Sequence, residues 1–74
     1  MMKAAEVSAL IANILELDYI TDDDNFFDLG GNSILALALI SRIKEKSGVE
    51  ISLLDFIYDP TAHGLAQRTE RSGD

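Results

Sequence analysis

Residues 26–35 read FFDLGGNSIL, and this stretch joins a polar loop to the start of a helix. Its aromatic and leucine side chains would anchor the loop to an apolar core, while its two glycines allow a tight turn. Ser33 then opens a run of apolar residues, where its hydroxyl would be exposed and close to the positive end of the helix dipole. The stretch therefore predicts a hydroxyl held at a helix N-terminus, well placed to carry a phosphate ester.

The helix that begins at Ser33 is expected to cover residues 33–46 and to stop at Gly48, since glycine readily takes the left-handed conformation that ends many helices. No polar residue occurs within residues 34–40, so this helix has more apolar surface than one core contact needs. One stripe at helical spacing is expected to face the core and consists of Ala36, Leu39, Ile40 and Ile43. A second stripe begins beside Ser33 and consists of Ile34, Leu37, Ala38 and Ser41. It predicts an exposed contact surface, unless the aromatic loop covers it.

The remaining segments also predict helices. Apolar residues at the spacing of an amphipathic helix open the chain, and the polar residues 18–32 then form a long loop. Ser52 and Asp55 resemble a capping box ahead of a short helix, and Pro60 separates that helix from a last one. The expected fold is all-α, a small bundle of three main helices plus one short helix with a long first loop. The expected helices cover residues 4–17, 33–46, 53–58 and 61–68 of a single domain over residues 1–74.

Composition narrows the class of protein. Seventy-four residues without cysteine suit one small core that no disulfide supports. Six basic and thirteen acidic residues give a net charge of −7, which argues against nucleic acid or an anionic membrane as a partner. No apolar stretch is long enough to span a membrane, and the first residues lack the apolar segment of a signal peptide. We therefore expect a cytoplasmic monomer.

The sequence lacks the pattern of further residues that catalysis at Ser33 would need. Position 35 is leucine, so the segment lacks the second glycine of a nucleophile elbow. A serine hydrolase also needs a histidine base with an orienting acid, and His63 is the only histidine in a chain whose 74 residues leave little room for a substrate pocket. The aspartates of the long loop do not match the spacing of a calcium-binding loop. These observations favour a point of attachment over an active site.

The stretch 26–35 resembles the attachment-site motif of carrier proteins, and most of all that of the peptidyl carrier domains of nonribosomal peptide synthesis. The resemblance continues through the first helix, the long loop and the later Asp59-Pro60-Thr61 segment. It implies that a separate phosphopantetheinyl transferase esterifies Ser33 with 4′-phosphopantetheine from coenzyme A. The thiol of that arm would hold an aminoacyl or acyl group as a thioester, and the chain itself would not be an enzyme.

The resemblance also implies roles for the neighbours of Ser33. The surroundings of the arm would be Gly30, Gly31 and Asn32. The partner-facing surface would consist of Ile34, Leu37, Ser41, Phe56 and Ile57. The implied partners are the transferase, an adenylating or acyl-loading enzyme, and downstream condensing or tailoring enzymes.

Two other readings of the chain stay open at this point. Acyl carriers of polyketide or other pathways share the same chemistry, although carriers of fatty acid synthesis typically have aspartate where this chain has Asn32. Arg42, Lys44 and Lys46 on the second helix also favour the peptidyl class over those acidic carriers. A different class of protein is a small helical interaction module, in which Ser33 would only cap the helix.

Overall fold

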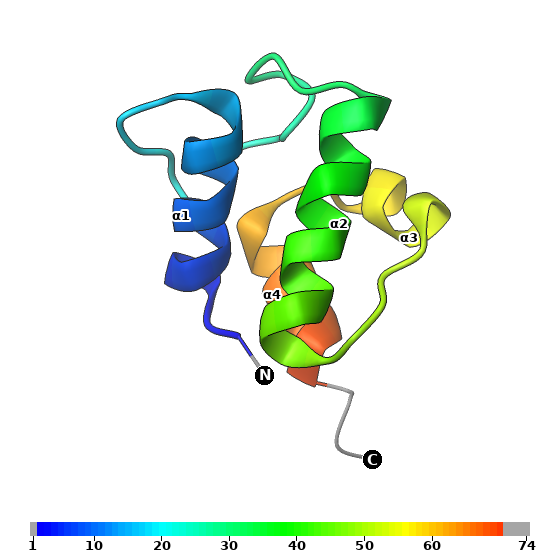
Figure 1. The fold of residues 1–74 in the computed structure, drawn as a ribbon. Helices are drawn as coiled ribbons and strands as arrows, with labels where there is room; N and C mark the ends of the chain where they lie inside the picture. The colour runs from blue at the N-terminus through cyan, green and yellow to red at the C-terminus, as the bar shows by residue number, and fades with distance from the viewer. Residues whose placement is uncertain (1, 71–74) are drawn as a thin grey trace.

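The computed structural model describes residues 2–70 and contains four helices in this part of the chain, with no strand. They are α1 (Ala4–Leu15), α2 (Ser33–Ser47), α3 (Leu53–Tyr58) and α4 (Ala62–Thr69). The all-α prediction is therefore confirmed. Figure 1 shows α1 and α2 side by side, α4 behind them and the short α3 at the edge beside α2. The packing contacts join α4 to α1, α1 to α2, and α2 to α3.

Local capping explains where the helices end. α1 stops at Leu15 and not at residue 17, because Glu16 takes a left-handed conformation with φ of 58° and its N–H bonds back to carbonyls of the last turn. Gly48 ends α2 in the same conformation, with φ of 79°, as predicted. α4 begins one residue later than predicted because Thr61 is its N-cap, whose hydroxyl oxygen accepts a hydrogen bond from the backbone N–H of Gly64 at 3.0 Å.

The core forms where the apolar stripes of the helices meet. The predicted core stripe of α2 is buried in full, and the interior of α1 lies against it. Phe26 enters this core from the loop between α1 and α2 and is completely buried. Its ring makes edge-to-face contacts with Phe27 and with Phe56 of α3, at centroid distances of 5.5 and 5.2 Å. The aromatic residues of the loop therefore anchor it to the core, as their sequence predicts.

The long loop before α2 is also tied to the helices around it by polar contacts. The backbone N–H of Phe26 donates to the carbonyl of Pro60 at 2.9 Å, and that of His63 donates to the carbonyl of Asp22 at 2.9 Å. The carboxylate of Asp22 accepts a hydrogen bond from the hydroxyl of Ser8 on α1 at 2.7 Å. The loop is thus hydrogen-bonded both to α1 and to the start of α4, and these contacts fix the position at which α2 begins.

Gly64 in α4 should resist replacement by alanine. In most helix interiors this change stabilises a protein by about 1 kcal/mol. Here a Cβ at position 64 would overlap the carboxyl group of Asp59, which also accepts a hydrogen bond from Thr61. We expect Gly64→Ala to lower the free energy of unfolding by about 1 kcal/mol or more, because Asp59 must move. Urea unfolding checks this, with Gln67→Ala on the same helix as control; a stabilised Gly64→Ala protein would contradict it.

Candidate functional site

Ser33 is the first residue of α2 and is exposed. Its hydroxyl makes no hydrogen bond to any residue in the described range 2–70. The first turn of α2 holds no acidic residue, so no carboxylate there competes for the positive end of the helix dipole. An anionic group attached to this hydroxyl would therefore face a favourable field and open solvent.

The helix cap belongs to Asn32, the residue before Ser33. Asn32 has an extended backbone, and its side-chain oxygen accepts a hydrogen bond from the backbone N–H of Leu35 at 2.9 Å. The interpretation in which Ser33 caps the helix is therefore wrong. Because Asn32 supplies the side-chain cap, the hydroxyl of Ser33 is not engaged in capping the helix.

The cap allows a direct test of this division of roles. Asn32→Ala removes the only side chain that caps the first turn of α2 within the described residues. We expect the free energy of unfolding to fall by about 1 kcal/mol, measured by urea denaturation. Asn32→Asp should keep most of the stability, since a carboxylate oxygen also accepts this bond. Equal losses in both variants would show that the cap is not the cause.

Two glycines precede the cap and serve different purposes. Gly30 has φ of 106°, a conformation that glycine adopts easily, and nothing lies within 4 Å of where its Cβ would be. Gly31 donates its N–H to the carbonyl of Phe26 at 3.0 Å, and a Cβ at this position would overlap the Phe26 ring. One glycine thus permits the turn, and the other permits close packing beneath Ser33.

The second stripe of α2 is exposed, because the aromatic loop packs into the core instead of covering it. Five of the seven exposed large apolar side chains of the described residues lie on α2 and α3. We call them the contact surface: Ile34 (78% exposed), Leu37 (54%), Leu54 (81%), Ile57 (49%) and Tyr58 (84%). Ser41, farther along the same helix, is exposed as well. An apolar surface of this kind beside Ser33 is typical of a protein-binding site.

The structure corrects one residue of the predicted surface and adds two. Phe56 is fully buried against Phe26, so it belongs to the core and not to the exposed surface. Leu54 and Tyr58 are exposed instead. The sequence of α3 could not settle this, because nearly all of its six residues are apolar and no polar face marks the outside. The spacing of Leu54 to Tyr58, one helical turn, was the available signal that these two share a face.

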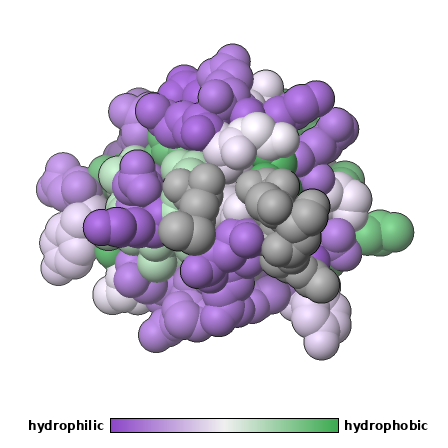
Figure 2. All heavy atoms as spheres, turned by 90° about the horizontal axis from the view of Figure 1, so that it is seen from below, coloured by the Kyte–Doolittle hydropathy of each residue, from purple (hydrophilic) through white to green (hydrophobic). Residues whose placement is uncertain are grey.

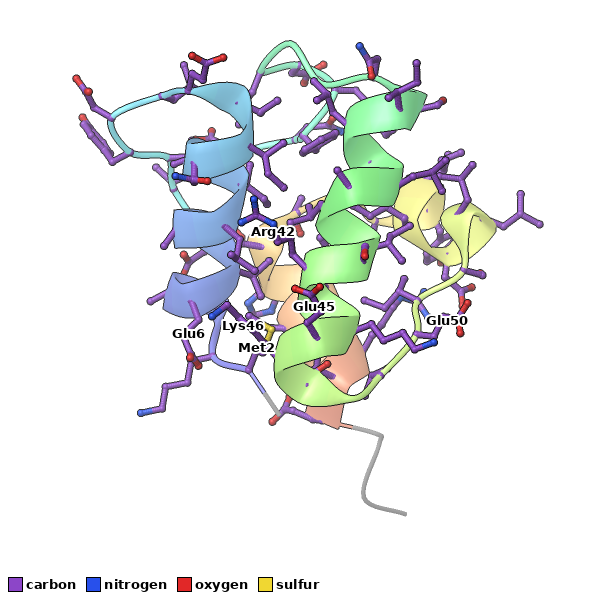
Figure 3. The ribbon with its side chains drawn as sticks, viewed as in Figure 1. Met2, Glu6, Arg42, Glu45, Lys46 and Glu50 are labelled. Carbon is purple, nitrogen blue, oxygen red and sulfur yellow. The ribbon has the colours of Figure 1, made fainter. Side chains whose placement is uncertain are left out.

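The charged residues of α2 lie toward the end of the helix that is distant from Ser33. Figure 3 shows Arg42, Glu45 and Lys46 on the half of α2 that is distant from its N-terminus. Lys44 forms an exposed ion pair with Glu50 at 3.1 Å, of the kind that adds little stability. The end of the molecule opposite Ser33 shows mostly hydrophilic residues among the atoms coloured in Figure 2.

Away from Ser33, the described residues offer no site for a metal ion. Within residues 2–70, no group of three or more His, Cys, Asp or Glu side chains could hold a metal ion. His63 is exposed on α4, and its ring nitrogen contacts the side chain of Gln67 at 3.3 Å. None of the described helices is both long and apolar enough to cross a membrane.

Comparisons with known proteins agree with this arrangement. The family model described as "Phosphopantetheine attachment site" matches residues 5–69. A dimodular nonribosomal peptide synthase of Bacillus subtilis (strain 168) is 49% identical over 61 residues, which cover 82% of this chain and 3% of that protein. A linear gramicidin synthase of Brevibacillus parabrevis is 39% identical over 64 residues, which cover 86% of this chain and 1% of that protein. The chain thus spans a very small part of these relatives.

Solved structures show the same fold. A structure described as a nonribosomal PCP domain has 36% sequence identity and a TM-score of 0.74, with 90% of this chain and 88% of that chain covered. A peptidyl carrier protein complex with the phosphopantetheine transferase Sfp and coenzyme A gives a TM-score of 0.89 at 26% identity, with 95% and 91% of the two chains covered. The helix arrangement around Ser33 is therefore shared with these structures.

Proposed function

The chain belongs to the phosphopantetheine attachment site family, as a carrier domain of the kind found in nonribosomal peptide synthetases, and we propose that Ser33 carries its 4′-phosphopantetheine arm. The observation that carries this proposal is the exposed hydroxyl of Ser33 on the first turn of α2. The surroundings suit the group, since the adjacent turn is built of glycines and the first turn of the helix has no acidic residue. When bound, the arm supplies a terminal thiol that holds an aminoacyl or acyl group as a thioester.

Attachment makes one demand on this chain, a reachable nucleophile. The Ser33 oxygen forms a bond to the phosphorus that bears the pantetheine of coenzyme A, and the bond from that phosphorus to adenosine 3′,5′-bisphosphate breaks. The hydroxyl proton passes to a base of the transferase, because the Ser33 hydroxyl has no hydrogen-bond acceptor among the described residues of this chain. The positive end of the α2 dipole then stabilises the phosphodiester that remains. On this account the chain is a non-catalytic carrier.

The contact surface is proposed to receive the enzymes that act on the arm. Ile34 and Leu37 lie within the first two turns after Ser33, and Ile57 lies on the helix that packs against α2. A transferase, an adenylating or acyl-loading enzyme, and condensing or tailoring enzymes would each need to grip the carrier close to the arm. A peptidyl carrier protein of the same fold forms a complex with the transferase Sfp, which supports a transferase as the first of these partners.

The peptidyl class is proposed over other acyl carriers. Asn32 precedes the serine, and the exposed cations of α2 leave no acidic stripe along that helix. An enzyme that recognises carriers through carboxylates on this helix would find only Glu45 there. We therefore expect the cargo to be an aminoacyl group supplied by an adenylating enzyme.

Intact-mass measurement tests the proposed function. The protein is incubated with coenzyme A, Mg²⁺ and a broad-specificity phosphopantetheinyl transferase. We expect the mass to rise by one phosphopantetheinyl group, and peptide fragmentation should place that group on Ser33. A protein that stays unmodified under conditions that convert a known peptidyl carrier would instead support the helical interaction module.

A further inference from the structure

We propose that Phe26 is a positioning residue for Ser33, which holds the turn before α2 against α3 so that the hydroxyl and the contact surface keep one relative geometry. This inference rests on the proposed function of Ser33. Phe26 lies seven residues before Ser33 in the sequence. Its side chain is fully buried, so it cannot contact a partner enzyme directly. Its role would be exerted through the residues that its ring and backbone support.

The ring of Phe26 connects the loop with α3. It packs edge-to-face against Phe56 at a centroid distance of 5.2 Å with an interplanar angle of 88°. Phe27 packs against the same two rings, at 5.5 Å from Phe26 and 5.9 Å from Phe56. Phe56 is the neighbour in sequence of Ile57, which is part of the contact surface. The aromatic cluster therefore joins the loop that leads to Ser33 with the helix that presents Ile57.

The backbone of Phe26 holds the loop on both sides. Its N–H donates to the carbonyl of Pro60, in the link between α3 and α4, at 2.9 Å. Its carbonyl accepts the N–H of Gly31, two residues before Ser33, at 3.0 Å. This hydrogen bond keeps the backbone of Gly31 close to Phe26. The Phe26 ring in turn leaves no room for a Cβ at position 31. The turn that places Ser33 therefore rests on Phe26.

Substitutions at the two glycines of this turn test two different effects, the packing against Phe26 and the backbone conformation. A Cβ at Gly31 would displace the Phe26 ring, whereas a Cβ at Gly30 would meet nothing within 4 Å. Alanine at Gly30 would instead strain the backbone, whose φ is 106°. A smaller side chain at position 26 should therefore relieve alanine at position 31 but not alanine at position 30.

The test compares wild type with Gly30→Ala, Gly31→Ala, Phe26→Leu and the two double variants that contain Phe26→Leu. The kcat and KM of the transferase for each carrier are measured by intact mass at saturating coenzyme A. We expect Gly31→Ala to lower kcat about tenfold or more with little change in KM, because the hydroxyl is misplaced while the contact surface is intact. Phe26→Leu alone should also lower kcat, by a smaller factor, because leucine supports the turn under Gly31 less fully. Added to Gly31→Ala, it should restore part of the lost kcat, and it should restore none of any loss in Gly30→Ala.

Urea unfolding of each variant separates positioning from stability. If the role of Phe26 were only structural, the rates would follow the folded fraction, and adding Phe26→Leu would make both glycine variants worse. That result, or a wild-type kcat in Gly31→Ala, or equal rescue of both glycine variants, would overturn the proposal. Phe26→Met replaces Phe26→Leu if the latter does not fold, since a flexible thioether adapts to irregular space.

A second measurement does not depend on modification. The backbone amide NMR shifts of Ser33 and Ile34 should change in Gly31→Ala and return toward wild-type values when Phe26→Leu is added. If the wild-type protein is not modified by the transferase, the proposed function fails while this measurement still decides the packing between Phe26 and Gly31. Unchanged shifts in Gly31→Ala would overturn the positioning role by themselves.

Discussion

Ser33→Ala is expected to abolish attachment of the arm completely, while the domain remains folded. The new bond needs the serine oxygen, and alanine offers no nucleophile in its place. The fold should tolerate the change because Ser33 is exposed, makes no side-chain hydrogen bond within residues 2–70 and leaves the helix cap to Asn32. Alanine is also the better helix former. We therefore expect a change of about 0.5 kcal/mol or less in the free energy of unfolding.

Intact mass after treatment with transferase and coenzyme A measures the first effect, and urea unfolding measures the second. Ser41→Ala is the matched control, since Ser41 is also an exposed serine of α2. It should be modified like wild type. An adduct that persists in Ser33→Ala would show that another residue carries the arm. A fall of about 1 kcal/mol in the free energy of unfolding would show that the Ser33 side chain does cap the helix.

Leu37→Asp is expected to lower kcat/KM of the transferase by about 30-fold, through a higher KM, without unfolding the domain. Leu37 is about half exposed on the contact surface, so a carboxylate there remains hydrated in the free protein. Binding of an apolar partner surface would bury that charge, and losing a central contact of an interface commonly costs about 2 kcal/mol, which corresponds to this factor.

Two controls show whether the effect comes from the contact surface. Leu39→Asp places the same charge on the other side of α2, where the side chain is fully buried, and should prevent folding. Gln67→Asp adds the same charge on the exposed side of α4 and should leave the kinetics unchanged. Circular dichroism reports folding, and modification kinetics report binding. If Leu37→Asp unfolds, the second stripe is core; if its KM is that of wild type, the transferase does not bind here.

Much of the fold followed from local patterns. The limits of α3 match the prediction, and α2 ends one residue later than predicted, because Asn32, Gly48 and Ser52 are strong capping residues that act within one turn. α1 ended two residues early for a reason that its spacing did not reveal. The apolar pattern continues to Leu17, but Glu16 adopts a left-handed conformation, which few residues other than glycine do readily.

Part of the candidate site could likewise be predicted from the sequence, and part could not. The FFDLGGNSIL stretch was enough to single out Ser33, since a serine that follows paired glycines at the start of an apolar helix can be recognised from neighbouring residues alone. The sequence did not show which side chains of α3 face the core and which face the solvent. Phe56 was expected on the surface and lies in the core, because the choice depends on Phe26, which is thirty positions earlier in the chain.

Local sequence, through side chains and backbone groups a few residues apart, was therefore enough for the four helices, for the Ser52 and Gly48 caps and for the exposed hydroxyl of Ser33. Contacts between distant segments decided which apolar residues are exposed and why Gly31 must be glycine. The physical reason is that burial is a property of the packed molecule. The Phe26 ring fills the space beneath Gly31 only once the loop, α3 and the Pro60 link have come together.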